Sequence, residues 1–408
     1  MNRTPRNLLS RRNILLAAGT ASVAIVAAVA CGQTREDTTV EEVEPAVTPE
    51  AEAVQPSPSP ELPANLQFST FGWKTDFSKH SVPLSEISSG GPGKDGIPPI
   101  DDPAFITSDE AAAYLDDRKP VVVVEVNGEA KAYPIEILVW HEIVNDTIGG
   151  VPVTVTFCPL CNTAIAFDRR LDGTTYDFGV SGNLRYSDLI MYDRQTESWW
   201  QQITGTAIVG ELTGKKLTTV PASIVSFADF RSTHPEGPVL SRETGNPRSY
   251  GRNPYLGYDD ISRSPFLFYE EVDGRLPAME RVVTVSLNGE DAAYPFNVLA
   301  EQRVVEDSVG GEPIVVFHQP GAISPFSGAD IGAAGVFAPV VDGATLKFQV
   351  NDDGKIVDTE TQSQWNVLGR AIAGPLTGKQ LQSIVNGNHF WFAWAVFKPD
   401  TRVFGLSN

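Results

Sequence analysis

Hydrophobic and polar residues alternate along much of this chain, and a period of two predicts β-strands. The clearest case runs from Val151 to Phe157, where every second residue is apolar, and leads into Cys158-Pro159-Leu160-Cys161. A second apolar run follows at 164–167. The pattern predicts two strands joined by a tight turn that carries both cysteines. The 35 Gly and 30 Pro favour many such turns and few long helices.

Two short helices are expected among the strands. Thr107-Ser108-Asp109-Glu110 places capping residues before an Ala-rich run, which predicts a helix over 108–115. Residues 121–133 alternate around Asn127-Gly128 and predict a hairpin, and a helix is expected to follow it over 134–144. The fold class predicted from these patterns is mainly β, a β-rich α+β protein.

An internal repeat organises the strand-rich part of the chain. Asn127-Gly128-Glu129 recurs 161 residues later as Asn288-Gly289-Glu290. Further pairs match in order: Tyr133 with Tyr294, Asp146 with Asp307, Asp193 with Asp358, Trp200 with Trp365, and Leu212-Thr213-Gly214-Lys215 with Leu376-Thr377-Gly378-Lys379. The matches predict two tandem homologous units, 120–237 and 280–408, joined by a connector at 238–279. We expect the two units to pack about a pseudo-twofold axis.

The first 31 residues have the features of an export signal. Four Arg precede an apolar stretch that ends in Ala28-Val29-Ala30-Cys31, which resembles a lipobox, and Ser10-Arg11-Arg12 resembles a twin-arginine signal. We expect cleavage before Cys31 and lipidation of that residue, with an uncleaved N-terminal anchor as the alternative. Both interpretations place the protein outside the cytoplasm, at the cell surface and attached to the membrane.

Residues 32–64 predict a disordered tether, because they contain six Pro, eight acidic residues and no aromatic residue. Residues 65–119 are expected to form an ordered N-terminal extension of the repeat units. The formal net charge of the whole chain is −20. Such an acidic surface disfavours nucleic acid as a partner, and no protein partner can be named from the sequence.

Several sequence blocks together resemble a known family. They are Ser89-Gly90-Gly91-Pro92, Trp140-His141-Glu142-Ile143-Val144-Asn145-Asp146, Phe157-Cys158-Pro159-Leu160-Cys161, Ser181-Gly182-Asn183-Leu184, His234-Pro235, Asn253-Pro254-Tyr255 and Phe390-Trp391-Phe392-Ala393-Trp394. The chain is similar over residues 66–406 to the family catalogued as domain of unknown function 3179. The resemblance implies an exported bacterial or archaeal protein without an agreed biochemical function. Asn162 stands where this family pattern suggests Gly, and Asn also tolerates the left-handed conformation.

The two cysteines of the turn, Cys158 and Cys161, can be interpreted in three ways. A disulfide closing so small a loop would restrain the unfolded chain only slightly. A redox-active pair has this spacing, but such pairs usually lie at a helix N-terminus, which lowers the thiol pKa. A metal knuckle fits the strand-turn-strand pattern better, although it needs further ligands.

His141 is the candidate third ligand, because it lies 17 residues before Cys158 in the same unit. At the positions of His141, Cys158 and Cys161 the second unit has Gln302, Gln319 and Ala322, so the three differ together while the scaffold residues persist. This joint difference favours one common site. His234 is a weaker candidate ligand, and Arg185 and Asp188 are candidates to line the site.

The leading hypothesis is a soft or borderline metal site, for copper or zinc, formed by Cys158, Cys161 and His141. One alternative is a thiol-disulfide oxidoreductase in which Cys158 attacks. The other is a non-enzymatic surface binding module in which the cysteine pair is structural. The motifs leave open whether the protein is an enzyme.

Overall fold

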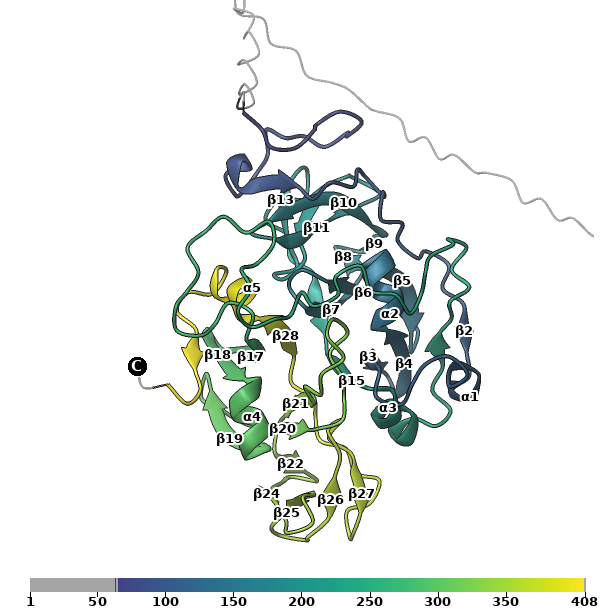
Figure 1. Ribbon diagram of the computed structural model, residues 1–408, viewed down its shortest axis with the longest axis vertical. Helices are drawn as coiled ribbons and strands as arrows, with labels where there is room; N and C mark the ends of the chain where they lie inside the picture. The colour runs from purple at the N-terminus through teal and green to yellow at the C-terminus, as the bar shows by residue number, and fades with distance from the viewer. Residues whose placement is uncertain (1–62, 64, 407–408) are drawn as a thin grey trace, which may run out of the picture. The chain divides into compact units, whose positions relative to one another are not determined.

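Strands supply most of the regular structure, as the alternating pattern predicts. The computed structural model describes residues 63 and 65–406, which belong to one compact unit (Figure 1). The α-helices in this part of the chain have only four to seven residues each. The expected mainly β class is therefore confirmed.

The predicted export signal (1–31), its lipidation site Cys31 and the tether (32–64) lie outside the described residues, except for Pro63. Those predictions remain untested by the structure. Across 63 and 65–406, no helix combines the length and the apolar character needed to cross a membrane.

The N-terminal extension packs on the first repeat unit. Its strand β1 (Ile87–Ser89) pairs with β10 (Phe178–Arg185). Phe68 and Phe77 contact the ring of Trp199 at centroid distances of 5.1 and 5.2 Å. Aromatic contacts of this kind add stabilisation beyond simple burial. The extension is thus part of the same hydrophobic structure.

The predicted helix at 108–115 is shorter than expected. Helix α1 spans Ser108–Ala111 and begins with the expected capping box between Thr107 and Glu110. The backbone then tightens into turns, with Tyr114 N donating to Ala111 O. The second predicted helix, α2, forms at Ile135–His141.

The first unit begins with the predicted hairpin of β3 (Pro120–Val126) and β4 (Glu129–Pro134). Helix α2 follows, and then β5 (Ile143–Ile148), β6 (Val151–Cys158) and β7 (Thr163–Asp168). These last three strands lie in one sheet, with the order β14-β7-β6-β5. The sheet therefore holds the cysteine turn at the end of β6.

A separate sheet of this unit has the strand order β1-β10-β11-β12-β13. Besides β1 and β10 it contains β11 (Asp188–Asp193), β12 (Trp199–Gln201) and β13 (Thr206–Val209). The remaining elements up to residue 240 are η1 (Leu84–Glu86), β2 (Phe105–Ile106), β8 (Arg170–Leu171), β9 (Thr174–Thr175), β14 (Thr218–Val220), β15 (Ala222–Ser226), α3 (Phe227–Thr233) and, at the start of the connector, β16 (Val239–Leu240).

The second unit follows the same order of elements. They are β17 (Arg281–Leu287), β18 (Glu290–Pro295), α4 (Phe296–Gln302), β19 (Val304–Val309), β20 (Glu312–Gln319) and β21 (Ala333–Phe337). Val121 pairs with Pro134 in the first hairpin, and Val282 pairs with Pro295 in the second, at the same offset of 161 residues. These two matches fall on paired residues of the two hairpins, while the division into two homologous units and their packing about a pseudo-twofold axis stay predictions.

Further short elements complete the chain after β21. They are β22 (Val340–Val341), β23 (Ala344–Thr345), β24 (Phe348–Val350), β25 (Ile356–Asp358), β26 (Gln364–Trp365), β27 (Ala371–Ala373), β28 (Asn386–Phe390), α5 (Trp391–Ala395) and β29 (Arg402–Val403). Strand β28 packs against β7 of the first unit. The backbone N–H of Phe390 donates to Cys161 O at 2.8 Å, so the second unit touches the cysteine turn directly.

Candidate functional site

The cysteine turn has the strand-turn-strand form that the sequence predicts. Strand β6 ends at Cys158 and β7 begins at Thr163, and these two residues are paired across the hairpin. Asn162 adopts a φ of 51°, the left-handed conformation that Asn tolerates better than most residues. The turn therefore closes without Gly at this position and brings both side chains to one end of the sheet.

A second hairpin, β10–β11, meets this turn from the neighbouring sheet. Arg185 and Asp188 are its last paired residues, which leaves Tyr186 and Ser187 as a two-residue loop with φ angles of 55° and 68°. Loops of this type normally use Asn and Gly, because other residues are strained at positive φ. The corresponding strands of the second unit, β24 and β25, are joined by a longer loop.

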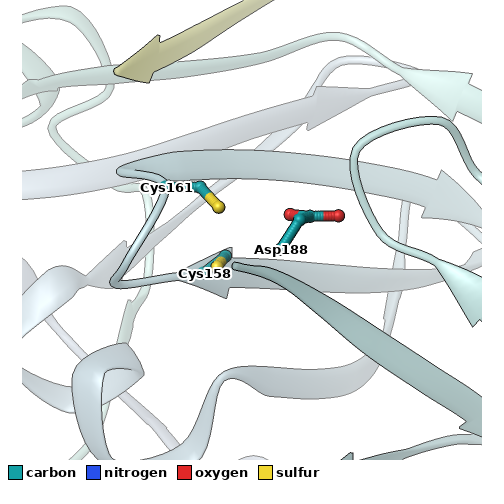
Figure 2. A group of neighbouring side chains, drawn as sticks. All are labelled: Cys158, Cys161 and Asp188. Atoms are coloured by element: carbon teal, nitrogen blue, oxygen red, sulfur yellow. The ribbon is translucent and has the colours of Figure 1, made fainter. Parts of the chain in front are cut away.

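The strained loop places the backbone carbonyl of Ser187 and the side chain of Asp188 next to the cysteines. Ser187 O lies 3.4 Å from Cys161 Sγ and 3.8 Å from Cys158 Sγ. The two sulfurs and a carboxylate oxygen of Asp188 all lie within 4.8 Å of one another (Figure 2). Both cysteines are free thiols. Two hairpins that are distant in the chain thus form one cluster of two sulfurs and a carboxylate.

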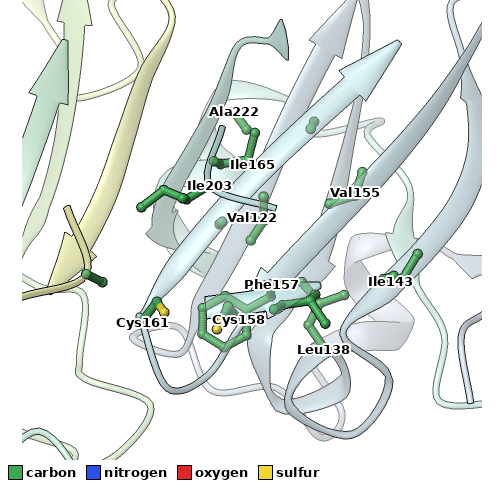
Figure 3. Packing of buried hydrophobic residues seen from close by; sticks show 14 of the residues in the cluster. Val122, Leu138, Ile143, Val155, Phe157, Cys158, Cys161, Ile165, Ile203 and Ala222 are labelled. Carbon is green, nitrogen blue, oxygen red and sulfur yellow. The ribbon is translucent and has the colours of Figure 1, made fainter. Parts of the chain in front are cut away.

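All three side chains of this cluster are buried. The exposed fraction is 1% for Cys158 and 0% for Cys161 and Asp188. Cys158 lies beside Phe157 at the end of the hydrophobic core of the β5–β7 sheet (Figure 3). Burying an aromatic or aliphatic side chain such as Phe157 stabilises the fold by about 1.5–3 kcal/mol. Both cysteines thus belong to the same hydrophobic core cluster as Phe157.

The carboxylate of Asp188 is held at only one of its two oxygens. Oδ2 accepts hydrogen bonds from Gln201 Nε2 at 2.6 Å and from the Ile203 N–H at 3.0 Å. Oδ1 is buried and has no hydrogen-bond partner within the described residues. A buried carboxylate oxygen without a partner is unfavourable, so it marks a position where a ligand would restore the lost interaction.

The site gathers acidic groups without a compensating cation. Burial raises the pKa of both thiols, and it raises the pKa of Asp188 to about 7. Burial and then the charge of Asp188 raise the pKa of Glu142 to about 8. No Lys, Arg or His in the described part of the chain is among the causes of these four shifts. A bound metal ion would favour the charged forms of the same groups.

Glu142 is the C-cap residue of helix α2, and its φ is 58°. It lines a cavity of about 70 Å³ together with Cys158 and Tyr255. Burial is the main cause that raises the pKa of Tyr255, and the charges of Glu142 and Cys158 contribute. The cavity is large enough for a small number of water molecules.

The connector reaches the same region. The Phe266 N–H donates to Tyr258 Oη at 3.2 Å, and Ser187 Oγ donates to Phe266 O at 2.7 Å. The connector is therefore tied to the strained loop that carries Asp188.

His141 does not join the cysteine cluster. Its Nδ1 bonds to Pro98 O at 2.7 Å, and its Nε2 bonds to Tyr250 Oη at 2.6 Å. The grouping of His141 with Cys158 and Cys161 is thus a correction to the sequence-based expectation. The last turn of α2 directs the His141 ring toward the N-terminal extension and the connector, and Asp188 takes the third position beside the sulfurs.

Two other candidates also lie elsewhere. His234 Nε2 is 3.7 Å from Glu125 Oε2, at the end of α3. Arg185 pairs with Glu86 at 2.6 Å, and its guanidinium lies over the Tyr186 ring. Of the side chains expected to line the site, only Asp188 is brought to the cysteines.

The sequence reasoning missed Glu142 and Ser187. For Glu142 a signal was present, because the corresponding residue of the second unit is Arg303, a reversal of charge next to the exchange of His141 for Gln302. Arg303 also ends its helix with a positive φ, and its Nε donates to His318 O at 2.8 Å. For Ser187 the contact is made by a backbone carbonyl, which no residue type reveals.

The family described as Protein of unknown function (DUF3179) matches residues 94–401, more than half of the chain. The chain belongs to this family. The resemblance seen in the sequence blocks is thereby confirmed, and the DUF3179 match includes every residue of the cysteine cluster. No curated protein matches the chain, and no solved structure does either. The family description assigns no function to DUF3179 proteins, so the chemistry of the cysteine cluster is the guide to function.

Proposed function

We propose that Cys158, Cys161 and Asp188 bind a soft or borderline metal ion, and that zinc fits the site best. The observation that carries this proposal is the buried cluster of two thiol sulfurs and one carboxylate oxygen within 4.8 Å of one another. The partnerless Oδ1 of Asp188 supports it, because a metal ion would satisfy that oxygen.

The spacing of the donor atoms suits a tetrahedral metal. Zinc–sulfur bonds of about 2.3 Å and zinc–oxygen bonds of about 2.0–2.2 Å place tetrahedral donors roughly 3.5–3.8 Å apart. The upper limit of 4.8 Å in the cluster therefore requires each donor–donor distance to shorten by at most about 1.3 Å. Small side-chain rotations of Cys158 and Asp188 can supply this shortening.

The donor set favours zinc over copper. Copper(I) prefers thiolate, thioether and imidazole ligands, whereas zinc accepts thiolate together with carboxylate. With Asp188 in place of His141, one of the three donors is a hard oxygen. Copper remains an outcome that elemental analysis would reveal.

Cys158 also lines a neighbouring cavity, which would give an open coordination position access to water. Three protein ligands with an open position are typical of catalytic zinc, whereas structural zinc usually has four. The cavity of about 70 Å³ gives room for water, and Glu142 lies on its wall. A metal-bound water beside a carboxyl group is therefore the arrangement that this proposal implies.

The thiol-disulfide alternative is less well supported. The attacking species in disulfide exchange is an accessible thiolate. Cys158 and Cys161 are almost completely buried, and burial raises the pKa of each thiol. Cys158 also ends a strand and has no helix N-terminus to lower its pKa.

Elemental analysis of the purified protein, combined with a count of reactive thiols, tests the metal proposal. We expect one zinc ion per chain, and loss of that ion in both Cys161→Ser and Asp188→Asn. After chelation, unfolding the protein in denaturant should expose two reduced thiols to the reagent. A metal-free protein that retains both thiols reduced and binds no added zinc would contradict the proposal. A metal-free protein with a readily reversible disulfide would instead favour the redox alternative.

We infer separately that the mature protein is lipidated at Cys31 and anchored outside the cytoplasm. The support is the sequence pattern alone, in which an apolar stretch ends at this cysteine. Mass spectrometry of the N-terminal peptide should find a diacylated Cys31. Cys31→Ser should block both cleavage and acylation, and an unmodified Cys31 in the mature wild-type protein would contradict the inference.

A further inference from the structure

A second cavity, of about 350 Å³, lies where the two repeat units meet. One wall comes from β7, β13 and β14 of the first unit, and the other comes from β17, β28 and α5 of the second. Its volume is within the range of small-molecule pockets, about 300–1,000 Å³. It does not include any residue of the cysteine cluster.

Among lysine and acidic side chains, only lysines line this cavity, and of these Lys216 is exposed. Lys216 and Lys398 line it, and no Asp or Glu is among the lining residues. Lys398 is paired with Asp291 at 3.0 Å. Lys216 forms no ion pair within residues 63 and 65–406. A free ammonium group in a chain of net charge −20 gives the cavity a local preference for anions.

The uncharged part of the wall combines hydroxyl groups with apolar side chains. Thr219 and Thr284, whose side chains carry hydroxyl groups, line the cavity. Ile165, Ile203 and Phe397 supply apolar surface. A ligand with one charged end, hydrogen-bonding capacity and an apolar body would match all three kinds of wall.

We propose that this cavity binds a small organic anion, whose carboxylate or phosphate group is recognised by Lys216. The hydroxyl groups of Thr219 and Thr284 would hydrogen-bond the anion, and the apolar side chains would pack against its body. The binding site is independent of the metal proposal, because none of these side chains belongs to the cysteine cluster.

Four probes of similar size and different charge test this inference. They are phenylacetate, phenyl phosphate, benzyl alcohol and benzylamine. Each is titrated into the full-length purified protein, and binding is followed by calorimetry and by the change in Tm. We expect phenylacetate or phenyl phosphate to bind, with the preferred anion identifying the acidic group, and the alcohol and amine to bind at least about tenfold more weakly.

The chain offers a matched pair of variants for this test. Lys216→Gln removes the cavity ammonium, whereas Lys215→Gln removes its neighbour, which pairs with Asp172 at 2.7 Å and does not line the cavity. Lys216→Gln should weaken anion binding about tenfold or more, and Lys215→Gln should leave it unchanged. Equal binding of all four probes, an equal effect of both variants, or no binding of either anion would overturn the inference.

Discussion

The backbone carbonyl of Ser187 lies 3.4 Å from Sγ of Cys161, although the two residues belong to hairpins in different sheets. The contact depends on a two-residue loop in which Tyr186 and Ser187 both have positive φ. Such a loop costs of order 1–3 kcal/mol for each strained residue. The surrounding packing maintains this strained geometry, and Asp188 reaches the cysteines because of it.

His141 is expected to contribute to stability and not to metal binding. Its two ring nitrogens bond to Pro98 O and Tyr250 Oη, and the side chain is fully buried. His141→Gln should therefore lower the free energy of unfolding by about 1–3 kcal/mol. Denaturant unfolding measures this change, and elemental analysis of the same sample should find an unchanged metal content.

Tyr250→Phe is the companion variant, because it removes the hydroxyl that bonds to Nε2, together with the bonds of that hydroxyl to Thr244 Oγ1 and Asn246 O. Tyr250→Phe should lower the free energy of unfolding by about 1 kcal/mol. This effect should be smaller when His141→Gln is already present. A His141→Gln protein that remains folded but loses its metal would show that His141 is a ligand, against this account.

The two units offer a matched test of a buried hydrogen bond. Asp193 Oδ2 accepts from Trp200 Nε1 at 2.9 Å, and Asp358 Oδ2 accepts from Trp365 Nε1 at 3.0 Å. Asp193→Ala and Asp358→Ala each leave a buried indole N–H without its partner, so each should cost at least about 2 kcal/mol. Denaturant unfolding of both variants is the measurement. Costs that differ by several kcal/mol would mean that the two aspartates do not play equivalent roles.

His389 should make stability depend on pH. Burial lowers its pKa from 6.5 to about 3, so the folded protein resists protonating a group that the unfolded chain protonates below pH 6.5. The stabilisation is therefore complete above pH 6.5 and is lost progressively as the pH falls toward 3. Between pH 7 and pH 5, the titration of His389 should lower the free energy of unfolding by about 2 kcal/mol.

His389→Gln isolates that effect. The variant also loses the contact with Thr163 Oγ1, which lies 2.8 Å from Nδ1 of His389. This loss lowers the free energy of unfolding by the same amount at both pH values. The change in the free energy of unfolding between pH 7 and pH 5, measured in urea for each protein, does not contain this constant loss. The wild-type protein should lose about 2 kcal/mol more than the variant over this interval, and equal losses would refute a depressed pKa.

The cysteine hairpin could be predicted from the sequence because its signals are local. Alternation on both sides of Cys158-Pro159-Leu160-Cys161 specifies two strands, and the turn must then present both thiols near one another. The β3–β4 and β17–β18 hairpins could likewise be predicted from the Asn-Gly turns at 127–128 and 288–289. These features depend on neighbours in the chain.

The third member of the cluster could not be chosen reliably, because it depends on contacts between sheets. In the sequence, His141 is closer to Cys158 than Asp188 is. The end of α2 nevertheless turns the His141 side chain toward Tyr250. Asp188 is placed by the register of β10 with β11 and by a strained loop. Neither the register nor the strain is visible in residue types alone.

Cobalt titration of the chelated protein tests the central claim most directly, because cobalt(II) bound to thiolate gives a charge-transfer absorption that grows with the number of sulfur ligands. We predict saturation at one cobalt per chain, with about half the thiolate absorption in Cys161→Ser and intact absorption in His141→Gln. In Asp188→Asn the affinity for cobalt should fall at least about tenfold. A wild-type protein with two reduced thiols that shows no thiolate-to-cobalt absorption at any cobalt concentration would contradict the account.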